Sequence, residues 1–387
     1  MAAEIPVAGE CDARFAPVRK EFERNFAERG DIGGAVSVFW QGKKVVDLWG
    51  GHRDRERTKP WREDTIAMTY SIGKSMLATG VHMLADRGVI DLEAPVARYW
   101  PEFAQGGKQD IKVRHVVSHH CGVIFNDAAK AGDIYDYEAM IRALEVQAPA
   151  WPAGTKGAYN SINFGYLNAE IIRRASGKPG PRFLQDELWS PLGVDFYGIG
   201  LDDAAIARCA TVYPAPAANA QLAAGSATNV QTNATRAWNA VPKPYNAEVI
   251  SSDAFRKAPV MSFGGHGTAR GIACVYAMLA NNGEFGGKRY LSAAAVQRAQ
   301  TEQWSEDQDG VYLRPYRMAM GYFKNKSGWV PMGPNPEAFG HHGLGGPLTF
   351  ADRDRNLAFC ALSNYQAAGA SVGERTEALV DATFRCV

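Results

Sequence analysis

Ser71 and Lys74 stand three residues apart at the beginning of a stretch that we expect to fold as a helix through about Arg87. On a helix, residues i and i+3 share one face, so the Ser71 hydroxyl and the Lys74 amine would point into the same space. The Ser71 amide would lie at the helix N-terminus, where backbone N–H groups are free to donate to a developing oxyanion. A hydroxyl nucleophile beside a basic amine is suited to acyl transfer through a covalent intermediate.

The same two residues also allow a purely structural interpretation. Ser71 would then cap the helix, and Lys74 would be a solvated residue of its first turn, although a lysine there opposes the helix dipole. The choice between the two interpretations therefore depends on the residues that accompany the pair.

A tyrosine is the first candidate partner. The stretch from Pro152 to Ser161 is a Pro/Gly turn that delivers Tyr159 just ahead of a predicted helix. A phenol is a poor base at its usual pKa of about 10, but a neighbouring ammonium favours the phenolate, which could accept the Ser71 proton. The alternative is a half-buried ring whose hydroxyl is hydrogen-bonded.

A glycine-rich run with two histidines is the second candidate partner. It extends from Phe339 to Pro347 and includes His341 and His342. Its glycines allow a substrate to lie against the backbone, and the histidines could donate hydrogen bonds to a carbonyl or alkoxy oxygen. The alternative is a turn with surface histidines.

The elements that must position these residues come from both ends of the chain. Residues 33–51 predict a β-hairpin, and residues 13–29 and 372–384 predict amphipathic helices. Further strands are predicted at 319–323, 348–351 and 356–362. Two early and three late strands indicate one antiparallel sheet whose faces are covered by helices.

The middle of the chain is predicted to contain helices rather than strands. It consists of helices with Pro/Gly/Asn-rich connections, and residues 212–246 form a long irregular segment, either a lid or a tolerated surface insertion. We therefore predict an α/β fold of the α+β type, with a central antiparallel sheet in one domain (1–95 plus 260–387). A mainly helical domain (96–259) is inserted into it.

Composition excludes several functions. The 387 residues are 46% hydrophobic and 11% aromatic, and 42 basic residues balance 41 acidic ones to a net charge of +1. Neither a nucleic acid nor a membrane is therefore an expected partner, and residues 1–15 do not resemble a signal peptide. The sequence lacks the common metal, dinucleotide and nucleotide motifs and the G-x-S-x-G elbow, so neither a metal nor a cofactor is expected.

The six cysteines are scattered without C-x-x-C spacing. That usage is typical of reduced, mostly buried thiols, and it predicts a cytoplasmic protein. Cys121, which lies between His120 and Gly122, is an alternative nucleophile, although most such thiols are buried and inert.

Taken together, these motifs resemble the class C β-lactamase-like serine hydrolases, and most of all their family VIII carboxylesterase branch. The resemblance covers nearly the whole chain. It rests on the Ser71–Lys74 pair, the Pro152–Tyr159 loop, Gly165–Leu167 with Glu170–Arg174, Pro191–Val194, Gly265–Arg270, Val113–His119, Phe339–Gly346 and Phe350–Asp352.

The resemblance implies a β-lactamase/transpeptidase-like fold and a role for each site residue. Ser71 would be the acylated nucleophile, and Lys74 and Tyr159 would share the role of base, with Tyr159 favoured in deacylation. The amides of Ser71 and Leu344 would form the oxyanion hole. Substrate would be bound by Ser161, His341, His342, Gly343 and Gly345.

Two positions depart from the β-lactamase pattern. His341 replaces the lysine that anchors the substrate carboxylate in that family, and a histidine is mostly neutral near pH 7. Ser161 stands where an asparagine is expected, and a serine cannot donate an amide NH₂ to a β-lactam side chain. Both departures favour an uncharged acyl substrate over a β-lactam.

We therefore predict an enzyme that cleaves carboxylic esters through an acyl-enzyme on Ser71, with a small-molecule ester or amide as its substrate. The open alternatives are an acyltransferase or amide-forming enzyme, a β-lactamase or D-aminopeptidase, and a non-catalytic binding relative. The sequence gives neither the acyl and alcohol parts of the substrate nor the oligomeric state.

Overall fold

The computed structural model describes residues 5–214, 232–243, 245–367 and 372–387. Within these ranges, a nine-stranded sheet has the order β1-β3-β2-β15-β14-β13-β12-β11-β10, and all of its neighbouring strands are antiparallel. In sheet order the strands are β1 (Val7–Cys11), β3 (Lys43–Gly51), β2 (Gly33–Trp40), β15 (Leu357–Ser363), β14 (Leu348–Asp352), β13 (Phe339–His342), β12 (Phe323–Lys324), β11 (Tyr316–Met318) and β10 (Trp304–Glu306). The pairing of β2 with β15 joins the two ends of the chain.

Short strands form smaller sheets. They are β4 (Ala67–Met68), β7 (His266–Gly267) and β5 (Phe196–Tyr197) in one, β6 (Tyr213–Pro214) with β16 (Tyr365–Gln366) in another, and β8 (Glu284–Phe285) with β9 (Lys288–Arg289) in a third.

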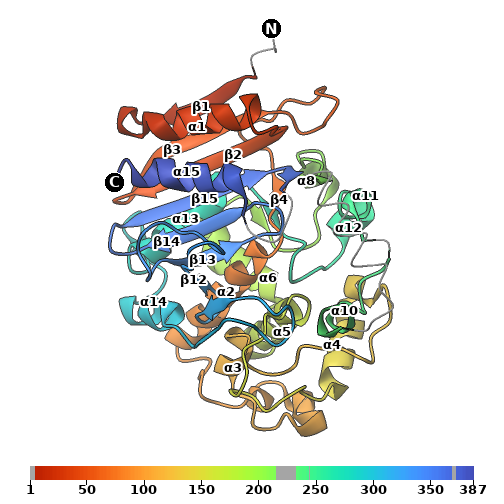
Figure 1. Cartoon of the computed structure of the whole chain (residues 1–387). Helices are drawn as coiled ribbons and strands as arrows, with labels where there is room; N and C mark the ends of the chain where they lie inside the picture. Colours follow the sequence, from red (N-terminus) through yellow and green to blue (C-terminus); the bar gives the residue numbers. More distant parts are fainter. Residues whose placement is uncertain (1–4, 215–231, 244, 368–371) are drawn as a thin grey trace.

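Helices cover both faces of the large sheet (Figure 1). On one face α1 (Ala16–Ala27) packs against α15 (Glu374–Phe384), and on the other α13 (Ala269–Ala280) contacts β2, β14 and β15. In β15, Phe359 and Ala361 join the cluster under α1 and α15, whereas Cys360 and Leu362 join the cluster on the opposite side. Because both faces are covered, this strand is a continuous apolar run rather than an alternating one.

The remaining described helices include α2 (Ile72–Asp86), whose residues from Ile72 to Leu84 are all buried. The others are α3 (Val113–Val117), α4 (Tyr137–Val146), α5 (Asn163–Ser176), α6 (Gly180–Leu184), α7 (Ser190–Leu192), α8 (Asp203–Ile206), α10 (Asn233–Ala237), α11 (Ala247–Ile250), α12 (Asp253–Lys257) and α14 (Ala293–Gln300). Figure 1 shows α2 between the sheet and α5. A Cβ on Gly80 would lie 3.0 Å from Ile172 of α5, so the small residue allows the two helices to pack closely.

The predicted fold class is confirmed, and most predicted elements are present. The 33–51 hairpin, the strands near 348–351 and 356–362 and the terminal helices all form. The predicted strand at 319–323 is wrong, because Gly321 adopts a φ of +86° in the turn that connects β11 to β12. The sequence interpretation also missed β1, β10 and β13 as separate strands.

The predicted irregular segment is only partly described. Residues 215–231 and 244 lie outside the described residues, and residues 233–237 form the short helix α10, whose capping box joins Thr232 and Thr235. The lid assignment and the division into two domains stay predictions. Among the described helices, none is long and apolar enough to cross a membrane.

Candidate active site

The nucleophile candidate stands at a tight turn between β4 and α2. Ser71 is the N-cap of α2, and the preceding Tyr70 is buried with a φ of +49°. A positive φ is uncommon for a bulky residue and persists only where the surroundings impose it. Here the Thr69 amide and hydroxyl both donate to the Gly265 carbonyl, at 2.9 and 3.0 Å. The turn therefore presents Ser71 at a fixed point on the first turn of the helix.

Lys74 lies beside Ser71, as the helical spacing predicts. Its Nζ is 3.0 Å from Ser71 Oγ and donates to the Ser262 carbonyl at 2.9 Å. The side chain is fully buried, and within the described part of the chain it forms no ion pair with a carboxylate. Burial therefore holds the pKa of Lys74 well below its usual value. A neutral amine at this position can accept the Ser71 proton.

Tyr159 reaches the same place from the loop ahead of α5. Its ring stacks on His119, with centroids 5.0 Å apart, and on Tyr316, at 5.4 Å. Lys74 Nζ is 5.3 Å from the ring centroid. Burial raises the pKa of Tyr159 well above its usual value, and the hydrogen bond to Ser71 opposes this only in part. Burial thus opposes the phenolate that a neighbouring ammonium was expected to favour, and it also favours the neutral form of Lys74.

Asp309 is a buried residue beside Tyr159 that sequence reasoning missed. Its carboxylate is completely buried and accepts hydrogen bonds from four backbone amides, those of Tyr159, Val311, Tyr312 and Arg314. The bond from Tyr159 measures 2.9 Å and the bond from Tyr312 measures 2.8 Å. Burial raises the pKa of Asp309, while these amide bonds lower it. A turn beginning at Asp309 was readable from the sequence, but its contact with Tyr159 was not.

The two amides predicted to bind an oxyanion lie on segments that approach closely. A Cβ on Gly343 would lie 2.6 Å from the Thr69 carbonyl oxygen and 3.0 Å from Tyr70 Cβ, so only glycine permits this approach. Leu344 follows in the turn after β13. Neither the Ser71 amide nor the Leu344 amide donates to another group of the described residues. Both N–H groups are thus available to a ligand.

The two histidines of this segment are neutral. His341 is completely buried, and its Nδ1 lies 2.8 Å from the His342 carbonyl oxygen. A carbonyl only accepts, so Nδ1 carries the proton, and the unprotonated Nε2 has no partner among the described residues. Burial, followed by the charge of Lys74, keeps the pKa of His341 well below its usual range, and burial lowers that of His342 to about 4. In this tautomer His341 Nε2 can accept a hydrogen bond but cannot donate one, which differs from the role expected from the sequence.

The remaining predicted binding residues surround the same turn and loop. Gly343 and Gly345 are buried, and Gly345 has a φ of +80°. Ser161 is 8% exposed, and its Oγ accepts a hydrogen bond from the Tyr312 hydroxyl at 2.6 Å. The structure therefore brings Lys74, Tyr159 and Gly343 to the start of α2, and it places Ser161 against Tyr312 and Gly345 against Gln366. Their roles stay predictions.

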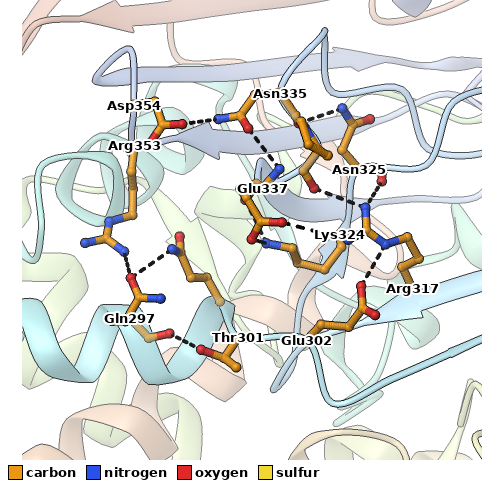
Figure 2. Close-up of polar contacts among 12 residues, drawn as sticks. Gln297, Thr301, Glu302, Arg317, Lys324, Asn325, Asn335, Glu337, Arg353 and Asp354 are labelled. Atoms are coloured by element: carbon orange, nitrogen blue, oxygen red, sulfur yellow. Dashed lines mark hydrogen bonds and ion pairs between the residues drawn. The ribbon is translucent and has the colours of Figure 1, made fainter.

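Polar side chains hold the connection between β12 and β13 in place (Figure 2). Lys324 is buried, and its Nζ donates at 2.8 Å to both the carboxylate and the carbonyl oxygen of Glu337. Asn325 Nδ2 donates to the Asn335 carbonyl at 2.8 Å, and Arg317 Nη1 donates to the Asn325 carbonyl at 2.9 Å. These bonds fix the beginning of β13, the strand that leads into the turn with Gly343 and Leu344.

Two other kinds of site are not supported. Burial raises the pKa of Cys121 to about 11, so this thiol is a poor nucleophile. In the ranges that the structure describes, no three His, Cys, Asp or Glu side chains are grouped so as to hold a metal ion.

Comparison with known proteins agrees with this geometry. The family model described as Beta-lactamase matches residues 21–384. The "Esterase/beta-lactamase LipL" of Mycobacterium tuberculosis is 33% identical over 92% of this chain and 83% of its own length. A crystal structure of a family VIII carboxylesterase superimposes with a TM-score of 0.90 and 35% identity, covering 99% of this chain and 100% of its own. A penicillin-binding protein homologue from Caulobacter crescentus gives a TM-score of 0.85 and 31% identity, covering 99% of this chain and 100% of its own.

Proposed function

The chain belongs to the beta-lactamase family, and we propose that it hydrolyses carboxylic esters of small molecules through an acyl-enzyme formed on Ser71. The observation that carries this proposal is the contact between Ser71 and Lys74. A buried amine with a lowered pKa lies 3.0 Å from a hydroxyl at a helix N-terminus. That arrangement activates a serine as a nucleophile.

Acylation follows from the protonation states of the two bases. Lys74 accepts the Ser71 proton while Oγ attacks the ester carbonyl carbon, and the resulting oxyanion is bound by the amides of Ser71 and Leu344. Such donors contribute about 3 kcal/mol each to transition-state binding. The tetrahedral intermediate then expels the alkoxide, which takes the Tyr159 hydroxyl proton, and the protonated Lys74 replaces that proton. The alcohol leaves, and the acyl group stays on Ser71.

Deacylation repeats these steps with water. Lys74, neutral again, is the final acceptor of the water proton, and Tyr159 relays it. This assignment replaces the sequence-based preference for Tyr159 as the deacylation base, because its raised pKa makes the phenolate costly. When the bond between the acyl carbon and Ser71 Oγ breaks, Lys74 returns its proton to Oγ, so the carboxylic acid is released and the Ser71 hydroxyl is restored.

The state of His341 supports an uncharged acyl group. A β-lactamase holds a carboxylate with a lysine at this position, whereas the neutral imidazole here presents an unprotonated nitrogen. A lone pair repels a carboxylate. Esters without a carboxylate in the acyl group are therefore the favoured substrates, ahead of β-lactams.

Hydrolysis of p-nitrophenyl acetate and butyrate, compared with turnover of a chromogenic cephalosporin and a D-amino-acid p-nitroanilide, tests the proposal. We expect ester cleavage to dominate and to disappear in Ser71→Ala. Dominant cleavage of the cephalosporin or the anilide would contradict it. Added alcohols and amines distinguish hydrolysis from acyl transfer, because a transferase forms the new ester or amide at the expense of the acid.

A further inference from the structure

Ser161 is the end of a chain of hydrogen bonds that begins on α10. Trp238, the C-cap of that helix, donates its Nε1–H to the Tyr312 hydroxyl oxygen at 2.7 Å. The Tyr312 hydroxyl donates in turn to Ser161 Oγ at 2.6 Å. Residues from three separate parts of the sequence thus meet, and the ring of Tyr312 lies 6.2 Å from that of Tyr159.

Trp238 determines which group donates and which accepts in this series of hydrogen bonds. An indole N–H can only donate, so the Tyr312 oxygen is occupied as an acceptor, and its own proton is directed to Ser161. A hydroxyl that already accepts a hydrogen bond keeps its proton to donate. The Ser161 proton is used by no group of the described residues. Burial also raises the pKa of Tyr312, which keeps its hydroxyl protonated.

Each member of the chain is held rigidly. Trp238 stacks on Phe263 with centroids 5.8 Å apart, and the ring of Tyr312 lies 6.2 Å from that of Tyr159. Asp309 accepts from the backbone amides of both Tyr312 and Tyr159, so it fixes the two tyrosines relative to each other. Ser161 comes two residues after Tyr159, and both side chains are 8% exposed. Ser161 is therefore exposed to the same small extent as Tyr159.

We propose that Tyr312 and Trp238 are specificity-determining positioning residues, which hold the Ser161 hydroxyl as a hydrogen-bond donor to the substrate. This inference rests on the proposed esterase function. The ligand chemistry that matches such a donor is an ester with a second acceptor oxygen, of the ether or carbonyl type, close to the scissile bond. That oxygen can belong to the acyl part or to the alcohol part.

Two pairs of esters of equal size separate these sources. Phenyl methoxyacetate and phenyl butyrate differ by an oxygen in place of a methylene in the acyl part, and 2-methoxyethyl butyrate and butyl butyrate differ in the same way in the alcohol part. For each pair, the ratio of kcat/KM for the ether ester to that for its hydrocarbon partner is compared between variants, which cancels the intrinsic reactivity of the esters.

Ser161→Ala and Tyr312→Phe should each lower this ratio roughly three- to tenfold in at least one pair, the effect of one lost hydrogen bond. Because the two residues act as a unit, the double variant should fall no further. Trp238→Phe should lower the ratio as well. Without the indole donor, the Tyr312 oxygen can accept the Ser161 proton, which is then no longer free to bind the substrate. The hydrocarbon ester of each pair has no second acceptor oxygen and is the internal reference for each variant. Tyr290→Phe, which removes a hydroxyl bound to the Pro191 carbonyl, is the matched control and should change nothing.

Unchanged ratios in both Ser161→Ala and Tyr312→Phe would overturn the inference while leaving the esterase function intact. A fall in Ser161→Ala alone would overturn the roles of Tyr312 and Trp238. An unmodified protein that cleaves none of the four esters would overturn both the inference and the proposed function.

Discussion

Asp309 and Tyr159 are joined by a hydrogen bond of 2.9 Å between a buried carboxylate and a backbone amide, although they are 150 residues apart in sequence. The same carboxylate accepts from the Tyr312 amide at 2.8 Å. One side chain therefore fixes both the proposed proton relay and the loop that orients Ser161. Asp309 is a positioning residue in this account, because it contacts backbone rather than substrate.

Replacing Asp309 by Asn should damage catalysis more than binding. The carboxamide keeps one acceptor oxygen and turns an NH₂ toward amides that need an acceptor, so we expect kcat to fall by about ten- to a hundredfold with little change in KM. The free energy of unfolding should fall by about 1–3 kcal/mol. Steady-state kinetics and urea unfolding measure the two effects. Asp307→Asn is the control, because Asp307 is 99% exposed and pairs only with Lys326. Equal losses in the two variants would refute the positioning role.

Lys74 and Tyr159 should behave as a unit. Lys74→Ala and Tyr159→Phe should each reduce kcat by several orders of magnitude, and the double variant should be hardly worse than the poorer single one. The reason is that the proton passes through both groups in one relay. Kinetics of the four proteins on p-nitrophenyl butyrate measure this coupling. A Tyr159→Phe variant with nearly normal kcat would show that the relay assignment is wrong.

The pH dependence of kcat/KM should report the pKa of Lys74. Only the neutral amine accepts a proton, so activity should fall as the pH drops through this pKa and should be constant above it. Burial lowers that pKa from 10.5, which places the plateau well below pH 10. If Tyr159 were the base, its raised pKa would make the rate climb past pH 10. A profile from pH 5 to pH 10.5 distinguishes the two cases.

Gly343→Ala should move the Leu344 amide away from the Ser71 amide, so that the two can no longer bind one oxyanion together. The new Cβ would lie 2.6 Å from the Thr69 carbonyl oxygen, so the turn after β13 must move away from the start of α2. Loss of one well-placed donor should cost about a hundredfold or more in kcat. KM and the cooperative unfolding transition should be retained, because the change is confined to the turn. Normal kcat in a folded Gly343→Ala variant would contradict the assignment of the Leu344 amide.

Local sequence patterns predicted the parts of the site that depend on local geometry. The i, i+3 spacing of Ser71 and Lys74 implied their contact, and the 3.0 Å distance agrees with it. The hairpin and the strand β15 could be predicted because burial in the sheet determines which of their residues are apolar. Gly321 is the exception, since a glycine in an apolar run allowed both a strand and a turn.

Properties that depend on distant residues could not be predicted. The pKa of Tyr159 depends on rings such as His119 and Tyr316, which only the fold brings together. The tautomer of His341 follows from the turn of the backbone at His342. The chain from Trp238 through Tyr312 to Ser161 joins three segments that no spacing rule relates.

Intact-protein mass spectrometry during turnover tests the central claim most directly. The protein is mixed with p-nitrophenyl butyrate and quenched within the first turnovers, while p-nitrophenol release is followed in parallel. We predict a burst of p-nitrophenol, a mass increase equal to one butyryl group that maps to Ser71, and neither signal in Ser71→Ala. Ester hydrolysis without a covalent adduct, or an adduct that persists in Ser71→Ala, would contradict the acyl-enzyme on Ser71.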